Sequence, residues 1–254
     1  MRGLSGASIW VESQTGGVGR TVLAANLAFE LAAKGHRVCL IDLDEQFPAL
    51  HEYFALPQRQ AAVLAAIRFL SQDRFDDVKL GELTARLVSK GAALDYLSGF
   101  GLAENEIDFD QLERLLEALC QRYQFVLVDV AAHASERMRE LGRKVASRRL
   151  FVVLAENVGL AHLASASPAL ESGSLGQLEI VLNRANLGVA GARTAAQIHK
   201  AVRELTAIPV AAVIPTDQIF DEAAARGMPL RQAGQKSKAL AAIGELAERL
   251  ATTL

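Results

Sequence analysis

The sequence has few cysteines, few aromatic residues, almost no net charge and no long apolar run. Its two cysteines, Cys39 and Cys120, lie inside apolar stretches, and their spacing fits neither a metal site nor a disulfide framework. We predict that both are buried as small hydrophobic residues in a reducing cytoplasm. No apolar segment follows Met1 as in a signal peptide, and no run approaches the length of a membrane span.

The low net charge limits the classes of partner. At a formal charge of −2 there is no general electrostatic attraction to nucleic acid or to an anionic membrane, so nucleic acid is an unlikely partner. Apolar residues make up 51% of the 254 residues, enough for a sizeable core, while aromatic residues make up 6%. With no repeat, low-complexity tract or linker, we expect residues 1–254 to form a single domain.

Short apolar runs alternate with helical patterns along most of the chain. The runs expected to be buried parallel strands are Ala7–Val11, Val38–Ile41, Phe125–Val128, Leu150–Leu154, Leu178–Leu182 and Val210–Ile214. The expected helices are Val22–Lys34, Gln111–Arg122, Glu136–Ala146, Thr194–Leu205 and Ser237–Thr252. This alternation predicts an α/β fold, a doubly wound, mostly parallel sheet with helices on both faces.

The stretch between residues 50 and 110 is less regular. We expect two helices there, near Ala61–Ser71 and Lys79–Val88, and a short strand near Leu94–Leu97. Gly35 follows the first long helix and is expected to cap its C-terminus.

A glycine-rich loop is the most informative stretch. Residues 15–21 read Thr-Gly-Gly-Val-Gly-Arg-Thr, between an expected strand and an expected helix. Glycines let several backbone N–H groups point at one anion, and the helix N-terminus adds partial positive charge. The order strand, loop and helix therefore predicts a phosphate-binding loop. The alternative is a glycine turn that binds no ligand.

Polar residues and one proline lie at the carboxyl ends of several of the expected strands. They are Asp42 and Asp44, Asp129, Asn183 and Pro215. In a doubly wound sheet these ends meet at one crevice, where carboxylates can hold Mg²⁺ and an amide can contact a base. For the two aspartates after the second strand the alternative is turn or helix capping, and for Asn183 it is turn chemistry.

The loop resembles the deviant P-loop K-G-G-x-G-K-[ST] of the MinD/ParA superfamily, with Thr15 and Arg20 where that family has lysines. Three further stretches resemble the CpaE/TadZ pilus-assembly branch of the superfamily. They are Asp42–Tyr53, Leu112–Leu116 with Tyr123–Asp129, and Phe220–Leu230 with Gln235–Lys238.

The resemblance implies roles for individual residues. Those implied to wrap the phosphates of ATP or ADP are Gly16, Gly17, Val18, Gly19 and Arg20. Thr21, Asp44 and Asp129 would hold Mg²⁺, partly through water. Asp42 and Asp44 would form switch I, with Asp44 and Arg20 as catalytic residues, and Asp129 would begin switch II. Asn183 would contact adenine, and Pro215 would lie near the base.

The resemblance also implies a function. It indicates a homodimeric, ATP-binding spatial organiser of pilus or secretion machinery, located in the cytoplasm, either at a pole or beside a membrane complex through protein partners. Because Thr15 cannot reach the phosphates of a partner subunit and Arg20 differs in shape from lysine, we expect slow or absent hydrolysis. The alternatives are a constitutively dimeric scaffold without productive nucleotide binding and a ParA-like ATPase that partitions DNA or another cargo.

Three remaining features have plain interpretations. The basic segment Glu136–Arg149 is expected to be mainly a solvated helix face, with partner binding as the second interpretation. His133 is expected to be a loop residue. The amphipathic segment Ser237–Leu254 lacks Trp and Phe, so we expect a core helix rather than a membrane-seeking one.

Overall fold

The computed structural model describes residues 6–44, 48–56, 61–102, 107–171, 178–187, 194–233 and 236–254. Residues 45–47 and Gln235, which belong to stretches that carry the CpaE/TadZ resemblance, lie outside the described residues.

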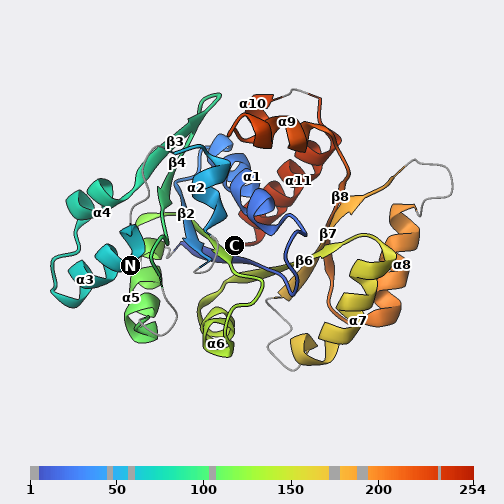
Figure 1. Ribbon diagram of the computed structural model, residues 1–254, viewed down its shortest axis with the longest axis horizontal. Helices are drawn as coiled ribbons and strands as arrows, with labels where there is room; N and C mark the ends of the chain where they lie inside the picture. Colours follow the sequence, from blue (N-terminus) through green and yellow to red (C-terminus); the bar gives the residue numbers. More distant parts are fainter. Residues whose placement is uncertain are drawn as a thin grey trace.

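An eight-stranded sheet forms the centre of the molecule (Figure 1). Its strands are β1 (Ala7–Glu12), β2 (Val38–Leu43), β3 (Ala85–Ser89), β4 (Ala92–Leu97), β5 (Phe125–Val130), β6 (Arg148–Leu154), β7 (Leu178–Ala185) and β8 (Val210–Pro215). The order is β3-β4-β2-β5-β1-β6-β7-β8, and only the β3–β4 pair is antiparallel. The predicted α/β architecture is confirmed.

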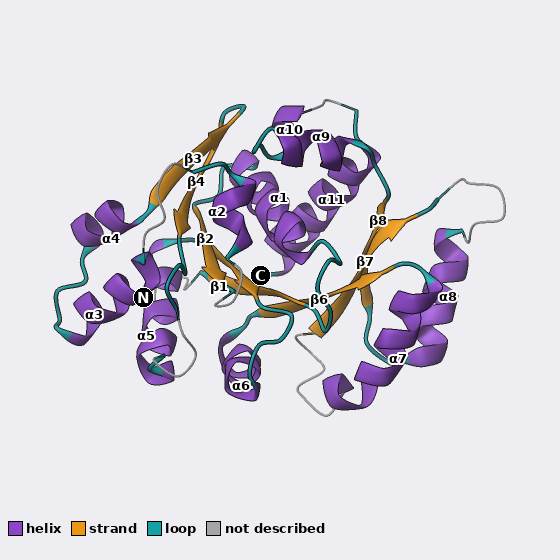
Figure 2. Ribbon diagram, in the orientation of Figure 1, coloured by secondary structure: helices purple, strands orange, loops and turns teal. Residues whose placement is uncertain are grey.

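Helices cover both faces of the sheet (Figure 2). They are α1 (Arg20–Ala33), α2 (Ala49–Tyr53), α3 (Ala62–Ser71), α4 (Asp77–Leu83), α5 (Phe109–Arg122), α6 (Glu136–Val145), α7 (Asn157–Glu171), α8 (Ala195–Leu205), α9 (Ile219–Ala225), α10 (Leu230–Ala233) and α11 (Lys238–Thr253). One face packs mainly against α1 and α11, and the other against α5, α6, α7 and α8. The central strands β1, β2 and β5 are buried along their whole length, as their continuous apolar sequence requires.

Helix α1 connects the glycine loop to the core. It begins at Arg20, directly after Gly19 in a left-handed conformation (φ 87°), and its face packs under the sheet. It ends at Ala33, and Gly35 (φ 88°) just beyond it donates its N–H to the Ala32 carbonyl at 3.0 Å. The expected glycine cap is confirmed, and the rigid helix fixes where the loop lies.

The helix expected over Lys79–Val88 is wrong in its second half. Helix α4 ends at Leu83, and Ala85–Ser89 forms the antiparallel edge strand β3. Leu87 is buried while its neighbours are not, which is the alternation of a half-buried strand. Lys90 (φ 42°) and Gly91 (φ 79°) then form a two-residue turn into β4, and this positive-φ pair is typical of a tight hairpin.

The C-terminal helix and the cysteines test two further expectations. Helix α11 buries Ile243 and Leu250 against α1, so it is a core helix as expected. Cys39 is buried, but Cys120 is only partly buried, and this partial burial raises the pKa of the Cys120 thiol to about 11.

Within the described part of the chain, none of the helices combines the length and apolar composition needed to cross a bilayer.

Candidate functional site

The glycine loop lines an open cavity at the carboxyl ends of the central strands. Gly17 (φ 75°) and Gly19 (φ 87°) both have backbone angles that favour glycine. A Cβ at Gly19 would lie 2.4 Å from Nδ2 of Asn183, so a larger residue there would have to displace the Asn183 side chain. The cavity has a volume of about 480 Å³ and is lined by Ser13, Thr15–Val22, Asp44, Ala49, Ala131–His133 and Arg184. We call it the phosphate cavity.

A second cavity of about 350 Å³ adjoins the first. Its lining residues come from the loop, the end of β7 and the β8–α9 connection: Gly19, Val22, Asn183, Arg184, Thr216, Asp217, Phe220, Asp221 and Ala224. Because Gly19, Val22 and Arg184 line both cavities, the two form one elongated space. We call this second part the base cavity. Its partly apolar wall, with a few polar groups, suits a flat heterocycle.

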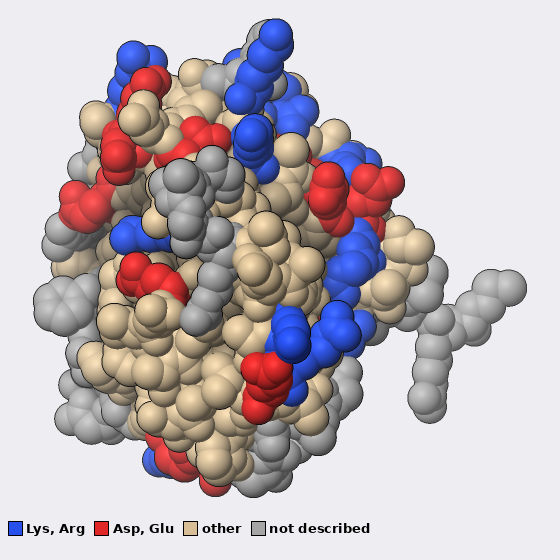
Figure 3. Space-filling model, turned by 90° about the vertical axis from the view of Figure 1, so that its right-hand side faces the viewer, with Lys and Arg blue, Asp and Glu red and all other residues tan. Residues whose placement is uncertain are grey.

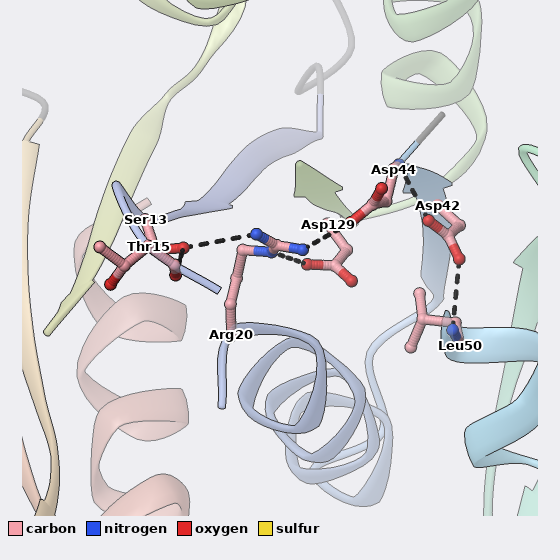
Figure 4. A network of polar contacts seen from close by, with 7 residues as sticks. All are labelled: Ser13, Thr15, Arg20, Asp42, Asp44, Leu50 and Asp129. Carbon is pink, nitrogen blue, oxygen red and sulfur yellow. Dashed lines mark hydrogen bonds and ion pairs between the residues drawn. The ribbon is translucent and has the colours of Figure 1, made fainter. Parts of the chain in front are cut away.

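Arg20 lines the phosphate cavity, and one side of its guanidinium faces two carboxylates (Figure 4). Its Nη2 donates to Oδ2 of Asp44 and its Nε donates to Oδ1 of Asp129, both at 2.8 Å. Its Nη1 donates to Oγ of Ser13 at 3.3 Å. Arg20 is 8% exposed and Asp129 is fully buried, so these are charge-assisted bonds shielded from bulk water. One guanidinium thus joins the ends of β1, β2 and β5.

Burial shifts the protonation of the carboxyl groups behind Arg20. Burial raises the pKa of Asp129, while Arg20 and a hydrogen bond from the Thr21 hydroxyl oppose that shift. Burial also raises the pKa of Asp42 well above its usual range, and the charge of Asp129 adds to the effect. Among the described residues, Oδ2 of Asp129 has no hydrogen-bond partner.

Asp42 lies behind the cavity rather than on its wall. Its Oδ1 accepts from the N–H of Asp44 at 3.0 Å, and its Oδ2 accepts from the N–H of Leu50 at 3.3 Å. Asp42 therefore fixes the segment after β2 and the start of α2, which is the capping alternative raised from the sequence. Its role in switch I stays a prediction.

Asn183 ties β7 to the glycine loop. Its Nδ2 donates to the Val18 carbonyl at 2.7 Å, and its Oδ1 accepts from the N–H of Arg184 at 3.0 Å. Both of these bonds are internal, yet the side chain also lines the base cavity. The expected contact with adenine stays a prediction, and the geometry adds a positioning role for the loop.

The β8 end differs slightly from expectation. Pro215 is the last residue of β8 and does not line either cavity, whereas the next residues, Thr216 and Asp217, line the base cavity. Sequence reasoning did not assign Thr216, Asp217 or Phe220 to the site. Their position after a strand end was the available signal, because strand ends in this fold meet at the crevice.

The site fits the phosphates of a nucleotide but does not fit Mg²⁺ while Arg20 bonds the carboxylates. The glycine loop and the start of α1 offer backbone N–H groups to an anion. Thr21, Asp44 and Asp129 supply the hard oxygens that Mg²⁺ prefers. However, Arg20 already bonds both carboxylates, and among the described residues no three acidic, histidine or cysteine side chains gather to hold a metal. With Arg20 in this place, the phosphate site fits its ligand and the Mg²⁺ site does not.

The basic segment is largely neutralised by neighbouring groups. Its pairs are Arg143 with Glu136, Lys144 with Glu113, and Arg149 with Glu12, while Arg137 lies over the ring of Phe109. On the face that Figure 3 shows, basic side chains are also interspersed with acidic ones. This pairing favours a solvated helix face over a site for a polyanion such as nucleic acid.

Fold and site together have the features of the P-loop NTPase fold: a mostly parallel sheet, a glycine loop before a helix, and a two-part cavity at the strand ends. The family model of the CobQ/CobB/MinD/ParA nucleotide binding domain matches residues 9–230. The chain belongs to this family, which confirms the superfamily that the sequence resembles. The CpaE/TadZ branch is a finer assignment and stays a prediction.

Known relatives match over nearly the whole chain. The chain is 26% identical over 246 residues to the septum site-determining protein MinD of Synechocystis sp., covering 95% of this chain and 88% of that protein. It is similar in structure to a ParA family ATPase from Chlorobium tepidum TLS (TM-score 0.78, 21% identity, 97% and 99% of the two chains). It also resembles MinD from Pyrococcus horikoshii OT3 complexed with Mg-ADP (TM-score 0.71, 21% identity, 96% and 95%).

Proposed function

We propose that this protein binds ATP or ADP and acts as a MinD/ParA-like spatial organiser of pilus or secretion machinery, with slow or no hydrolysis. The observation that carries the proposal is the buried bonding of Arg20 to Asp44 and Asp129 beside a glycine-lined cavity. The family membership supports nucleotide binding, and the CpaE/TadZ resemblance supports the pilus-related role.

The two cavities suit the two ends of a nucleotide. The phosphates would lie along the glycine loop at the start of α1, where N–H groups and the helix dipole favour negative charge. The base would lie in the adjoining cavity between Asn183 and Phe220. The exposed side chain of Arg184 lines both cavities and would contribute a positive charge between them.

Slow hydrolysis follows from the same contacts. A general base must accept a proton from the attacking water, and the Asp44 oxygen nearest the loop already accepts from the permanently charged Arg20. A Mg²⁺ ion, when bound in relatives of this kind, supplies charge neutralisation at the phosphates. In this chain Arg20 supplies a positive charge at the same wall of the cavity.

Dimerisation and location extend the proposal. We infer a homodimer that binds protein partners and is cytoplasmic, at a pole or beside a membrane complex. Thr15 lines the phosphate cavity where the superfamily's signature lysine would stand. Since threonine carries no charge for a partner's phosphates, dimerisation should depend less on nucleotide than in relatives with that lysine.

The first experiment asks whether nucleotide binds and turns over. The purified protein is denatured, released nucleotide is identified by chromatography, and titration calorimetry with ATP and ADP is compared with phosphate release. We expect binding with little turnover. Turnover above about one per second, within the usual range for enzymes, would contradict slow hydrolysis. Absence of binding would favour the constitutive scaffold instead.

The second experiment concerns dimerisation. Sedimentation is measured with and without ATP for the wild type and for Thr15→Lys, which restores the lysine. We expect a dimer in both conditions for the wild type and a stronger response to ATP for the variant. A wild-type monomer that dimerises only with ATP would contradict this part of the proposal.

The third experiment tests the role in the cell. A fluorescent fusion is followed with and without Asp44→Ala, which removes one carboxylate but leaves Arg20 paired with Asp129. We expect a persistent focus in both cases. A focus that disperses or begins to oscillate while the variant stays folded would instead favour a cycling, ParA-like partitioning ATPase.

A further inference from the structure

We propose that the guanidinium of Arg20 occupies the position of the divalent cation in this site, so that the protein binds nucleotide without Mg²⁺. The claim that nucleotide binds without Mg²⁺ rests on the proposed nucleotide-binding function. The claim that Arg20 closes the site between Asp44 and Asp129 to metal holds with or without nucleotide.

The geometry places Arg20 between the oxygens that a cation would need. The two 2.8 Å bonds to Asp44 and Asp129 come from Nη2 and Nε of the same guanidinium, so one edge of Arg20 faces both carboxylates (Figure 4). Mg²⁺ binds oxygen at about 2.0–2.1 Å and usually keeps several waters. The inner carboxylate is fully buried and Arg20 is 8% exposed, so a hydrated ion and this side chain do not fit together.

The type of side chain matters. Arginine presents five N–H donors in a fixed plane and stays charged at all relevant pH values. Here one donor contacts Asp44, one contacts Asp129 and one contacts Ser13. Arg20 also lines the phosphate cavity, so its positive charge lies beside the place where a phosphate would bind. A lysine ammonium at the same position would be a single point of charge and could not bridge in this way.

The charges around the phosphate cavity agree with a site that needs no metal. Asp44 is the one acidic residue among its lining residues, and Arg20 and Arg184 supply two positive charges. Asp129 lies behind Arg20, is fully buried and accepts a hydrogen bond from Nε of Arg20. A phosphate chain would therefore meet backbone N–H groups and two guanidinium groups without a metal to offset acidic side chains.

The first test measures ATP affinity by titration calorimetry with Mg²⁺ and with EDTA. We expect wild-type dissociation constants that agree within about threefold between the two buffers, equivalent to less than 1 kcal/mol. Arg20→Lys should bind at least about tenfold more tightly with Mg²⁺ than with EDTA. Arg149→Lys, a buried arginine outside both nucleotide cavities, is the matched control and should behave as the wild type. A tenfold preference of the wild type for the Mg²⁺ buffer would overturn the proposal.

The second test uses no nucleotide, so it separates this inference from the proposed function. Thermal unfolding is followed with and without Mg²⁺ or Mn²⁺ for the wild type, Arg20→Met and Arg20→Met combined with Asp44→Asn. Removal of the guanidinium opens the two carboxylates to metal. We therefore expect Arg20→Met to gain about 5 °C or more at a metal concentration of 100 times its dissociation constant. The wild type and the double variant should not respond.

The ATP and metal measurements together decide whether Arg20 closes the site between Asp44 and Asp129 to metal. If the wild type binds no ATP in either buffer, the proposed function fails, and the metal response of the protein alone still decides whether Arg20 closes the site. If Arg20→Met does not fold, Mn²⁺ binding to Arg20→Lys and to the wild type is compared by electron paramagnetic resonance. Wild-type protein that binds Mn²⁺ and loses this binding with Asp44→Asn would overturn the inference.

Discussion

Arg20 and Arg149 are both buried arginines paired with carboxylates, but their surroundings differ. Arg149 on β6 bonds Glu12 of β1 through Nη2 at 2.7 Å, which is one positive charge for one negative charge. Arg20 faces two carboxylates and also lines the phosphate cavity. The first pair is balanced within the fold. Both groups lie beside a cavity, but the second cluster keeps an excess of carboxylate next to the glycine loop, which is the arrangement expected of a binding site.

Of the substitutions that test the difference between these two buried arginines, Arg20→Met should have the largest effect on stability. The variant leaves Asp44 and Asp129 buried without their cation, so the free energy of unfolding should fall by about 3–5 kcal/mol. Asp44→Asn should be far milder, because Arg20 keeps Asp129 as its partner. Urea denaturation of both variants measures the difference. A loss below about 1 kcal/mol for Arg20→Met would place Arg20 with ordinary surface ion pairs.

Arg149→Met should cost less, about 3 kcal/mol at the lower end of the range for broken buried pairs, because a single carboxylate is left behind. Combining it with Glu12→Gln should recover most of the loss, since both charges are then removed. ATP affinity should be unchanged in both variants, because neither residue lines the phosphate cavity or the base cavity. Loss of ATP binding in the folded double variant would show that this pair also supports the nucleotide site.

The contrast also explains which parts of the site the sequence could predict. The glycine loop between β1 and α1 is local, so a phosphate-binding loop could be predicted from residues 15–21 alone. The bonding of Arg20 depends on the lateral order β2-β5-β1, which brings Asp44, Asp129 and the loop together from distant parts of the chain. Only the folded sheet defines that order.

The errors in secondary structure have a similar origin. In residues 79–88 a short apolar pattern fits a helix and a strand almost equally, and pairing with β4 decides for a strand at Ala85–Ser89. Continuous apolar strands such as β5 have no such ambiguity and were located from the sequence to within two residues. The β8–α9 wall of the base cavity was missed because Pro215, the residue chosen, lies next to the lining residues.

A smaller effect is expected at Asn183, which holds the loop beside Arg20. Asn183→Ala removes the bond to the Val18 carbonyl, so ATP affinity should fall about 5- to 30-fold, equivalent to about 1–2 kcal/mol. Asn183→Asp keeps the shape but has no donor for that carbonyl, and it should be at least as harmful. Calorimetry measures both. Wild-type affinity in Asn183→Asp would mean that the amide does not position the loop.

The smallest expected effect is a pH dependence at Glu12. Burial raises the pKa of its carboxyl group from the usual value near 4.5, while the charges of Arg149, Arg139 and Arg143 oppose the shift. Above pH 4.5 and up to that raised pKa, the native state therefore binds more protons at Glu12 than the unfolded state does. The contribution of Glu12 to stability must then fall as pH rises.

Glu12→Gln tests this dependence because glutamine cannot titrate. The free energy of unfolding of the wild type is compared with that of Glu12→Gln from pH 4.5 to 7. As pH rises, the value for the wild type should fall relative to that for the variant. Glu136 lines the same cavity as Glu12, but its hydrogen bond with Arg143 lowers the pKa of its carboxyl group, so its titration lies below this pH range in both proteins. In Arg149→Met the pH range of this dependence should extend to higher pH. The reason is that the variant lacks the charge of Arg149, which is the main charge that opposes the rise in the pKa of Glu12. If the free energy of unfolding of the wild type instead rises relative to that of Glu12→Gln as pH rises, the charge of Arg149 outweighs burial at Glu12. The Arg149–Glu12 pair would then be more strongly ionic than the Arg20 cluster.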